Sequence, residues 1–252
     1  MIGTLILIRV TGMMASAPFF RNSAIPTSVK ILLSILLSLV ITTAYWKDQP
    51  TFSLHLWNIT YLVFKEFMVG LIIGFSANTV FYGARFAGGL IDSEMGYQTG
   101  ALFDPENANP SLMGEFKELM TLMVFLFING HHYIIESMFI SIKAVPLTTF
   151  EISQTTVLLL TKMATTVLML GIKLASPLLV AMFLTNLALA LLARIAPQTN
   201  IFSLSFQFKV AIGLVVLFLS VPLAVLVAKY SLQGMQTEVL QVILSLLPSR
   251  VQ

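Results

Sequence analysis

The sequence has 252 residues, of which 57% are hydrophobic and only 10% are charged, and its mean hydropathy is +0.92. A soluble domain carries about 25% charged residues, so this composition indicates an integral membrane chain, too short for two large domains. The net charge is +3, and the 14 Lys and Arg residues form no basic cluster, which argues against a nucleic-acid partner. Cysteine is absent, which excludes disulfides, thiolate metal sites and a cysteine nucleophile.

Two hydrophobic stretches of nearly membrane-spanning length open the chain, at residues 2–20 and 29–46. The first superficially resembles a signal peptide. Arg9 interrupts its apolar run, however, and no basic region precedes it, so we predict an uncleaved first helix.

A third stretch begins near Leu56 and meets no helix-breaking pair until Gly88 and Gly89. At about 1.5 Å per residue it is longer than one simple crossing. Its GLIIG motif, from Gly70 to Gly74, is typical of helices that pack closely. We therefore predict that Gly70, Gly74, Gly88 and Gly89 lie at helix-packing surfaces.

The second half of the chain continues with broken apolar stretches. Residues 119–142 are interrupted by Asn-Gly-His-His at 129–132, and residues 156–194 are predicted to form two helical pieces separated at Pro177. Residues 207–230 form the last long stretch. Long and broken helices of this kind predict an all-α membrane protein that is one subunit of a larger assembly.

The C-terminal residues 235–248 show an amphipathic helical pattern. Their apolar positions are Val239, Leu240, Val242, Ile243, Leu246 and Leu247. We predict a separate C-terminal helix that lies at the membrane interface or against a partner.

Residues 84–117 carry an unusual density of glycine, proline and acidic residues. The segment holds Gly88, Gly89, Gly96, Gly100, Gly114, Pro105, Pro110, Asp92, Glu94, Asp104, Glu106 and Glu115. A lipid-facing segment would leave its backbone and its carboxylates unsatisfied. The residues alone leave two interpretations open: an exposed loop, or irregular backbone held inside a protein assembly or over a water-filled cavity.

Motifs for catalysis or metal binding are weak. His131 and His132 are adjacent, whereas a metal-binding pair on a helix is spaced i, i+4. The sequence contains no nucleophile elbow, phosphate-binding loop or dinucleotide fingerprint. We therefore expect no enzyme activity, no catalytic residue, no metal and no cofactor.

Several charged residues lie within or beside the apolar stretches: Lys65, Glu66, Glu136, Lys162 and Lys173. Charges buried in a membrane need a partner or water. They form either an ion or proton path, or salt bridges between helices or subunits, and we favour the salt bridges.

A polar cluster surrounds the turn after the stretch that ends at Arg194. The Arg194 charge suits the negative end of a helix macrodipole, and Pro197 stops the helix, leaving carbonyls that Gln198 and Asn200 can satisfy. The cluster is either a structural cap and turn or a subunit contact at a channel wall. Its full set is Asn186, Arg194, Pro197, Gln198, Asn200 and Phe202.

Three blocks, at residues 9–35, 88–138 and 176–213, together resemble the FliR family of flagellar export-gate proteins and its virulence relatives of the SctT or SpaR type. The Phe-Asp-Pro and Arg-x-Ala-Pro-Gln sequences within them are specific. The resemblance covers essentially the whole chain as a single domain, 1–252. Asn186 favours the flagellar branch.

The resemblance implies a subunit of a helical, roughly conical channel in the bacterial inner membrane, at the flagellar basal body. FliP-like and FliQ-like subunits would build the channel with it among membrane lipid, and FlhB-like and FlhA-like proteins would join them. Unfolded flagellar rod, hook and filament subunits would pass through. Two alternatives remain open: an injectisome export-gate subunit, and a secondary transporter for a small solute, although the sequence shows no internal repeat.

In this family an inward loop between the third and fourth hydrophobic segments closes the channel as a plug, and the resemblance places that loop at residues 96–114. Glycines let backbones approach closely, prolines fix turns, and apolar side chains exclude water and ions. The predicted plug residues are Gly96, Gly100, Leu102, Phe103, Asp104, Pro105, Asn109, Pro110, Leu112 and Met113.

Overall fold

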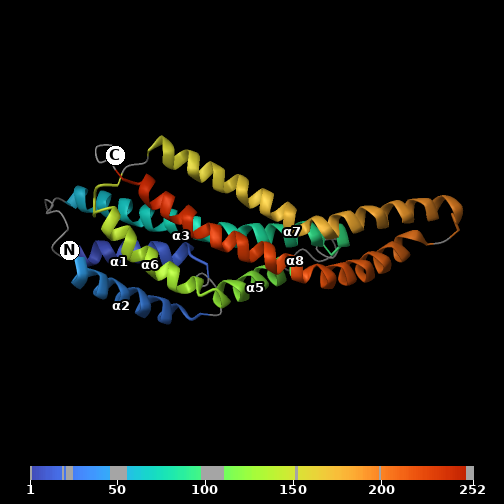
Figure 1. Ribbon diagram of the computed structural model, residues 1–252, viewed down its shortest axis with the longest axis horizontal. Coiled ribbons are helices and arrows are strands. Elements are labelled where there is room, and N and C mark those ends of the chain that lie inside the picture. The colour runs from blue at the N-terminus through green and yellow to red at the C-terminus, as the bar shows by residue number, and fades with distance from the viewer. Residues whose placement is uncertain are drawn as a thin grey trace. The chain divides into compact units, whose positions relative to one another are not determined.

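The computed structural model describes residues 2–18, 20, 25–45, 56–97, 111–150, 153–198 and 200–247. In this part of the chain all regular secondary structure is α-helical (Figure 1), which confirms the predicted all-α architecture. The helices are α1 (Ile2–Ser16), α2 (Thr27–Tyr45), α3 (Leu56–Met95), α5 (Leu112–Phe127), α6 (Gly130–Ala144), α7 (Gln154–Ile195) and α8 (Ile201–Ser245).

Four of these helices, α2, α3, α7 and α8, are long and apolar enough to cross a membrane. The pair α5 and α6 meets at a bend of 74° and adds a fifth candidate span if the two are taken together. The 15-residue α1 is apolar but shorter than a usual span. The described helices therefore make this a multi-pass membrane protein.

The bend between α5 and α6 lies at the Asn-Gly-His-His sequence, so the predicted interruption is confirmed. Asn129 has φ 58°, in the left-handed region that asparagine tolerates better than most residues. At the next position, Gly130, a Cβ atom would collide with the Phe125 ring. The bend thus depends on the particular residue types at these two positions.

Two predicted helix breaks are wrong, because α7 runs through Pro177 and α3 runs through Gly88 and Gly89. Pro177 has no N–H to donate to the Lys173 carbonyl. The Ser176 hydroxyl donates to that oxygen instead, at 2.9 Å. Such a substitute donor allows a proline to remain inside a membrane helix.

By its internal contacts the chain forms two compact units. Unit 1 contains Met1–Thr79, Phe125–Thr165 and Leu232–Gln252, and unit 2 contains Val80–Val124 and Thr166–Ser231. In unit 1, α1 packs against α2 and α6 (Figure 1). The buried core of this unit includes Leu5, Ile6, Val10 and Met13 of α1, Ile134, Met138 and Ile142 of α6, and Val239, Val242 and Ile243 of α8.

Unit 2 contains close helix crossings at glycine positions. A Cβ atom at Gly83 of α3 would lie 2.8 Å from the Leu170 side chain of α7, and one at Gly171 would lie 3.2 Å from the Gly83 carbonyl oxygen. A Cβ atom at Gly213 of α8 would lie 2.8 Å from the Met95 sulfur. These glycines let the helices of unit 2 approach one another closely.

The C-terminal segment differs from the prediction, because residues 235–245 continue α8 instead of forming a separate helix. Their apolar face is buried inside unit 1, with Val239 and Val242 both fully buried. The Tyr133 hydroxyl of α6 donates a hydrogen bond to the Gln236 carbonyl. This face therefore packs within its own chain, not at a membrane interface or on a partner.

The start of α7 holds the end of α8. The hydroxyls of Ser153 and Thr156 donate to the Ser245 carbonyl at 3.1 and 2.9 Å. The Ser153 hydroxyl also accepts the Thr156 N–H at 3.1 Å, which caps α7. One polar junction thus satisfies the N-terminus of one helix and the C-terminus of the other.

Candidate functional site

The predicted plug segment begins at the C-terminus of α3. Gly96 has φ 83°, a left-handed conformation that favours glycine. Its N–H donates to the Ser93 carbonyl at 3.3 Å, and the Tyr97 N–H donates to the Asp92 carbonyl at 3.0 Å. This is the Schellman pattern of a helix C-terminus, and it ends α3 just before the segment.

The segment returns at the N-terminus of α5, which is tied to the last turns of α3. The Ser111 hydroxyl accepts the Gly114 N–H at 2.8 Å and so caps α5. The same hydroxyl donates to the Asp92 carboxylate at 2.5 Å, and the Met113 N–H donates to this carboxylate at 3.2 Å. Asp92 is only 2% exposed, and its negative charge suits the N-terminus of α5.

The two helices also approach at glycines one turn away. A Cβ atom at Gly88 would collide with the backbone of Gly114, whereas one at Gly89 would meet nothing within 4 Å. We call the joined residues Gly88, Asp92, Ser111 and Gly114 the neck. The neck therefore joins the last turns of α3 to the start of α5, the two helices on either side of the segment.

An exposed ion pair lies beside the neck, between Arg85 of α3 and Glu118 of α5, at 2.5 Å. The two side chains are 51% and 34% exposed, so solvent screens the pair and it adds little stability. The buried Asp92 contacts therefore make the stronger connection.

Three of the predicted plug residues lie in the described part of the chain: Gly96 ends α3, and Leu112 and Met113 begin α5. Leu112 is 52% exposed. The others, Gly100, Leu102, Phe103, Asp104, Pro105, Asn109 and Pro110, lie outside the described residues.

The GLIIG motif lies against α1 of the same chain. A Cβ atom at Gly70 would collide with the Arg9 carbonyl oxygen, and one at Gly74 would lie 2.7 Å from the Met13 carbonyl oxygen. From the other side, a Cβ atom at Gly12 would lie 2.7 Å from the Phe67 carbonyl oxygen. The backbones of α1 and α3 are therefore in direct contact.

A buried ion pair, which the sequence analysis did not identify, joins α1 to α3 beside these glycines. The Arg9 guanidinium lies 2.6 Å from the Glu66 carboxylate, and the side chains are 1% and 0% exposed. Arg9 also donates to the carbonyls of Ser141 and Val145 at the end of α6, at 3.0 and 2.7 Å. Glu66 therefore forms a salt bridge between helices of one chain, as we favoured for this group of charges.

Glu66 has a second role in the connection between α6 and α7. Its carboxylate accepts the Thr148 N–H at 2.8 Å, and Thr148 has φ 74°, an unfavourable conformation for a β-branched residue. The neighbouring Lys65 ammonium donates to the Phe150 carbonyl at 3.1 Å. Two consecutive residues of α3 thus hold this connection in place.

Comparison with known proteins gives the family of the chain. Residues 1–235 match the family model described as Bacterial export proteins, family 1. The chain belongs to this family. It is 29% identical over 220 residues to the flagellar biosynthetic protein FliR of Escherichia coli (strain K12), covering 86% of this chain and 83% of that protein.

Other members that the chain matches include both flagellar and virulence proteins. This export-family chain is 26% identical over 218 residues to FliR of Bacillus subtilis (strain 168), covering 84% of this chain and 83% of that protein. It is 30% identical over 206 residues to the surface presentation of antigens protein SpaR of Shigella flexneri, covering 80% and 78%.

The turn between α7 and α8 of this export protein is exposed. Arg194 lies in the last turn of α7, and Arg194, Pro197 and Gln198 are exposed, as is Asn186 farther back on α7. The Asn200 side-chain oxygen accepts the Ser203 N–H at 3.3 Å and so caps α8. The Asn200 side-chain oxygen thus serves the following helix, and the prediction that Asn200 satisfies α7 carbonyls stays a prediction; the Phe202 side chain lies outside the described residues.

Lys117 of α5 is a further residue that the sequence analysis missed. It is 1% exposed, and among the described residues its ammonium has no hydrogen-bond partner. The sequence alone does not show that α5 turns this position inward.

Proposed function

We propose that this chain is a structural channel subunit of the flagellar type III export apparatus, which exports flagellar rod, hook and filament subunits. The observation that carries the proposal is the match to flagellar biosynthetic proteins across 86% of the chain. It acts by packing and assembly, and not as an enzyme.

The proposed partners are FliP-like and FliQ-like subunits in one hetero-oligomeric channel, with FlhB-like and FlhA-like proteins joining it in the bacterial inner membrane at the flagellar basal body. The described helices support an assembled state. Only 17% of the most apolar window of α2 and 17% of that of α8 is buried within the chain. The remaining apolar surface is available to lipid and to other subunits.

Within that channel, residues 96–114 act as the plug. A resting channel must hold back ions, and a passing polypeptide must displace whatever holds them back. The neck supports this role because buried contacts join the helices on either side of the segment. A short segment between fixed ends can rearrange without separating α3 from α5, and local opening of this kind requires few contacts to break.

The second candidate is the corresponding subunit of an injectisome, and the 30% identity to SpaR supports it. Asn186 favours the flagellar branch. A secondary transporter for a small solute is the candidate from another class, and the match to an export family across residues 1–235 speaks against it.

Deletion of the gene in the native bacterium tests the proposal, with secreted hook and filament proteins, injectisome substrates and swimming measured together. We expect loss of filament protein secretion and of swimming, both restored by a plasmid copy. Loss of injectisome secretion with normal swimming would favour the second candidate. Intact secretion through both systems would reject both.

Co-purification in mild detergent then tests the assembly. An export subunit should be recovered with different membrane proteins of the FliP and FliQ type. Recovery alone, or only with copies of itself, would favour a transporter.

A further inference from the structure

One face of α5 carries a row of large apolar side chains that stays exposed, whereas the opposite face, with Lys117 and Thr121, is buried. The spacing along this row is four, three and four residues. Such a spacing lines up apolar side chains along a helix, and it is the pattern by which two helices pack together. We call this row the α5 stripe: Leu112, Phe116, Leu119 and Met123, which are between 41% and 62% exposed.

An acidic edge accompanies the α5 stripe. Glu115 is exposed, and among the described residues its carboxylate forms no ion pair. Glu118 lies one turn farther along on the same side, where it pairs with Arg85 of α3. Glu115 also lies in the first turn of α5, where a negative charge suits the helix macrodipole. The stripe is thus flanked by a negative charge that is open to a cation from outside the chain.

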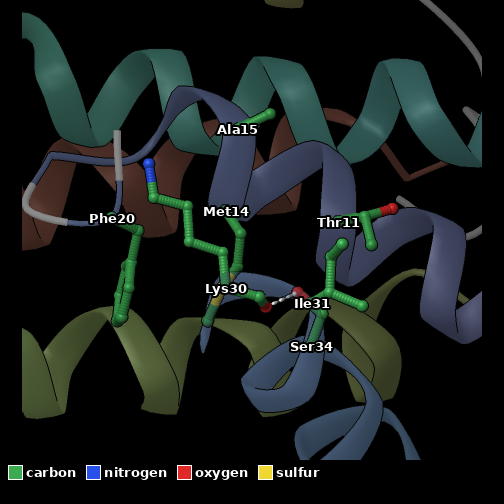
Figure 2. Close-up of a pocket in the computed structure, with 7 residues that line it drawn as sticks. All are labelled: Thr11, Met14, Ala15, Phe20, Lys30, Ile31 and Ser34. Atoms are coloured by element: carbon green, nitrogen blue, oxygen red, sulfur yellow. Dashed lines mark hydrogen bonds between the residues drawn. The ribbon is translucent and has the colours of Figure 1, made fainter. Parts of the chain in front are cut away.

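The groove of about 240 Å³ between α1 and α2 shows the contrasting case (Figure 2). Lys30, the charged residue in its lining, extends from α2 between Phe20 and Met14 (Figure 2). Lys30 already has an interaction partner, and the Ser34 hydroxyl donates to the Lys30 carbonyl at 2.8 Å. The polar residues of this groove therefore have partners within the chain, unlike the carboxylate of Glu115.

Three kinds of surroundings fit the α5 stripe poorly. Water would have to hydrate a continuous row of large apolar side chains. The hydrocarbon of a bilayer would leave the Glu115 carboxylate without a counter-ion or hydration. A second copy packing through its own α5 would supply no cation, because the basic residue of this helix, Lys117, lies on the buried face. A helix of a different protein, apolar on one face and with a basic residue beside it, meets both needs.

We propose that the α5 stripe is the docking surface for a helix of another subunit of the export complex. The partner helix presents apolar residues at heptad spacing over about 17 Å, the length of the stripe. A Lys or Arg of the partner lies beside the Glu115 carboxylate. This inference rests on the proposed function, because it requires that the chain be assembled with other subunits.

The test is photo-crosslinking in the assembled complex. A benzophenone amino acid replaces Leu119, and mass spectrometry locates the crosslinked residue. We expect a crosslink to the apolar face of one helix in another subunit, within a turn of a Lys or Arg. Glu115→Lys should lower the crosslink yield about fivefold, and a change of that basic residue of the partner to Glu should restore it.

Matched variants separate the stripe from general effects. Phe116→Gln should lower the crosslink yield at Leu119, whereas Phe218→Gln, which removes a more exposed ring from α8, should leave it unchanged. Glu118→Gln removes an acid that Arg85 already neutralises, and should change the yield little. The same benzophenone amino acid at Met123 gives a second measurement if its presence at Leu119 blocks assembly.

Several results would overturn the docking surface. Crosslinks only to lipid, to a second copy of the chain or to an exported polypeptide would do so. Failure of the partner's charge change to restore the crosslink would mean that Glu115 serves only the macrodipole of α5, and would also overturn it. If these crosslinks are absent while partner recovery and filament protein secretion stay normal, the docking surface alone is wrong and the proposed function stands.

Discussion

Arg9 and Glu66 show how single residues can decide the packing of unit 1. Two charges withdrawn from solvent lose a large hydration energy, which their attraction repays only when their remaining hydrogen bonds are made. Glu66 meets this condition through the Thr148 N–H, and Arg9 meets it in part through the carbonyls at the end of α6, whereas its Nη2 has no hydrogen-bond partner among the described residues. Each charge thus has its own backbone partners, so an arginine and a glutamate are not interchangeable between these two positions.

Glu66→Gln is expected to destabilise the chain by about 3–5 kcal/mol, because it leaves the Arg9 charge buried without its counter-ion. The matched control is Glu118→Gln, which breaks an exposed pair and should lower stability by at most about 1 kcal/mol. Thermal unfolding of the purified complex in detergent measures both.

Exchanging the two charges, Arg9→Glu with Glu66→Arg, should not rescue stability. The new glutamate would face the C-terminal carbonyls of α6, and the new arginine would face the Thr148 N–H. Recovery of wild-type stability in this double variant would show that only the mutual attraction of the charges matters.

At the scale of helices, the contact between α1 and α3 depends on glycine. Gly74→Leu should force the helices apart, because even its Cβ would lie 2.7 Å from the Met13 carbonyl oxygen. We expect a loss of at least about 1–3 kcal/mol and failure to assemble, although the chain still inserts.

Gly89→Leu is the matched control for this change, since its Cβ would meet nothing within 4 Å. Co-purified partner subunits measure assembly, and membrane fractionation measures insertion. If Gly74→Leu recovers as much partner as Gly89→Leu, the close packing of α1 and α3 is not required.

Asp92→Ala tests the neck at the same scale. It removes the acceptor for the Ser111 hydroxyl and the Met113 N–H, so we expect a loss of about 1–2 kcal/mol and raised ion conductance through the resting complex. The control is Ser93→Ala, because the exposed Ser93 hydroxyl bonds only within its own helix, to the Leu90 carbonyl at 2.8 Å. Equal ion conductance through complexes carrying Asp92→Ala and Ser93→Ala would show that the neck does not contribute to holding back ions.

Long apolar runs in the sequence predicted the position of each described helix at least in part. Their ends were less predictable. α7 continues through Pro177, where the Ser176 hydroxyl donates to the Lys173 carbonyl, and Gly88 serves as a contact with α5 rather than as a break. The partners of Arg9 could not be predicted from the sequence, because Glu66 and Ser141 are 57 and 132 residues away from it along the chain.

At the scale of the whole molecule, the exposed apolar surface of the described helices is suited to contact with lipid and with other subunits. The proposed channel requires a seal that opens, and we assign that role to the proposed plug, residues 96–114. Deleting residues 98–110 with a short Gly/Ser bridge should leave the helices inserted and the neck intact, because Ser111 is retained to cap α5. We expect increased small-ion conductance and poorer growth on induction.

Ion flux in cells or liposomes carrying the complete complex measures this effect. Single changes at Glu106 or Asn107 should do much less than the deletion, because in the proposed plug apolar side chains, and not charges, make the seal. Equal flux through correctly assembled wild-type and deleted complexes would remove the plug from the proposed function.

The composition of unit 1 also bears on how the chain is made. Its core combines α1 and α6 with Leu232–Gln252, so its packing cannot be completed until residues 232–247 have left the ribosome. At about 5–20 residues per second, α1 waits roughly ten to fifty seconds in the membrane with Arg9 and its packing face not yet enclosed. During that interval Arg9 and the packing face of α1 lack the contacts that α6 and the end of α8 later provide.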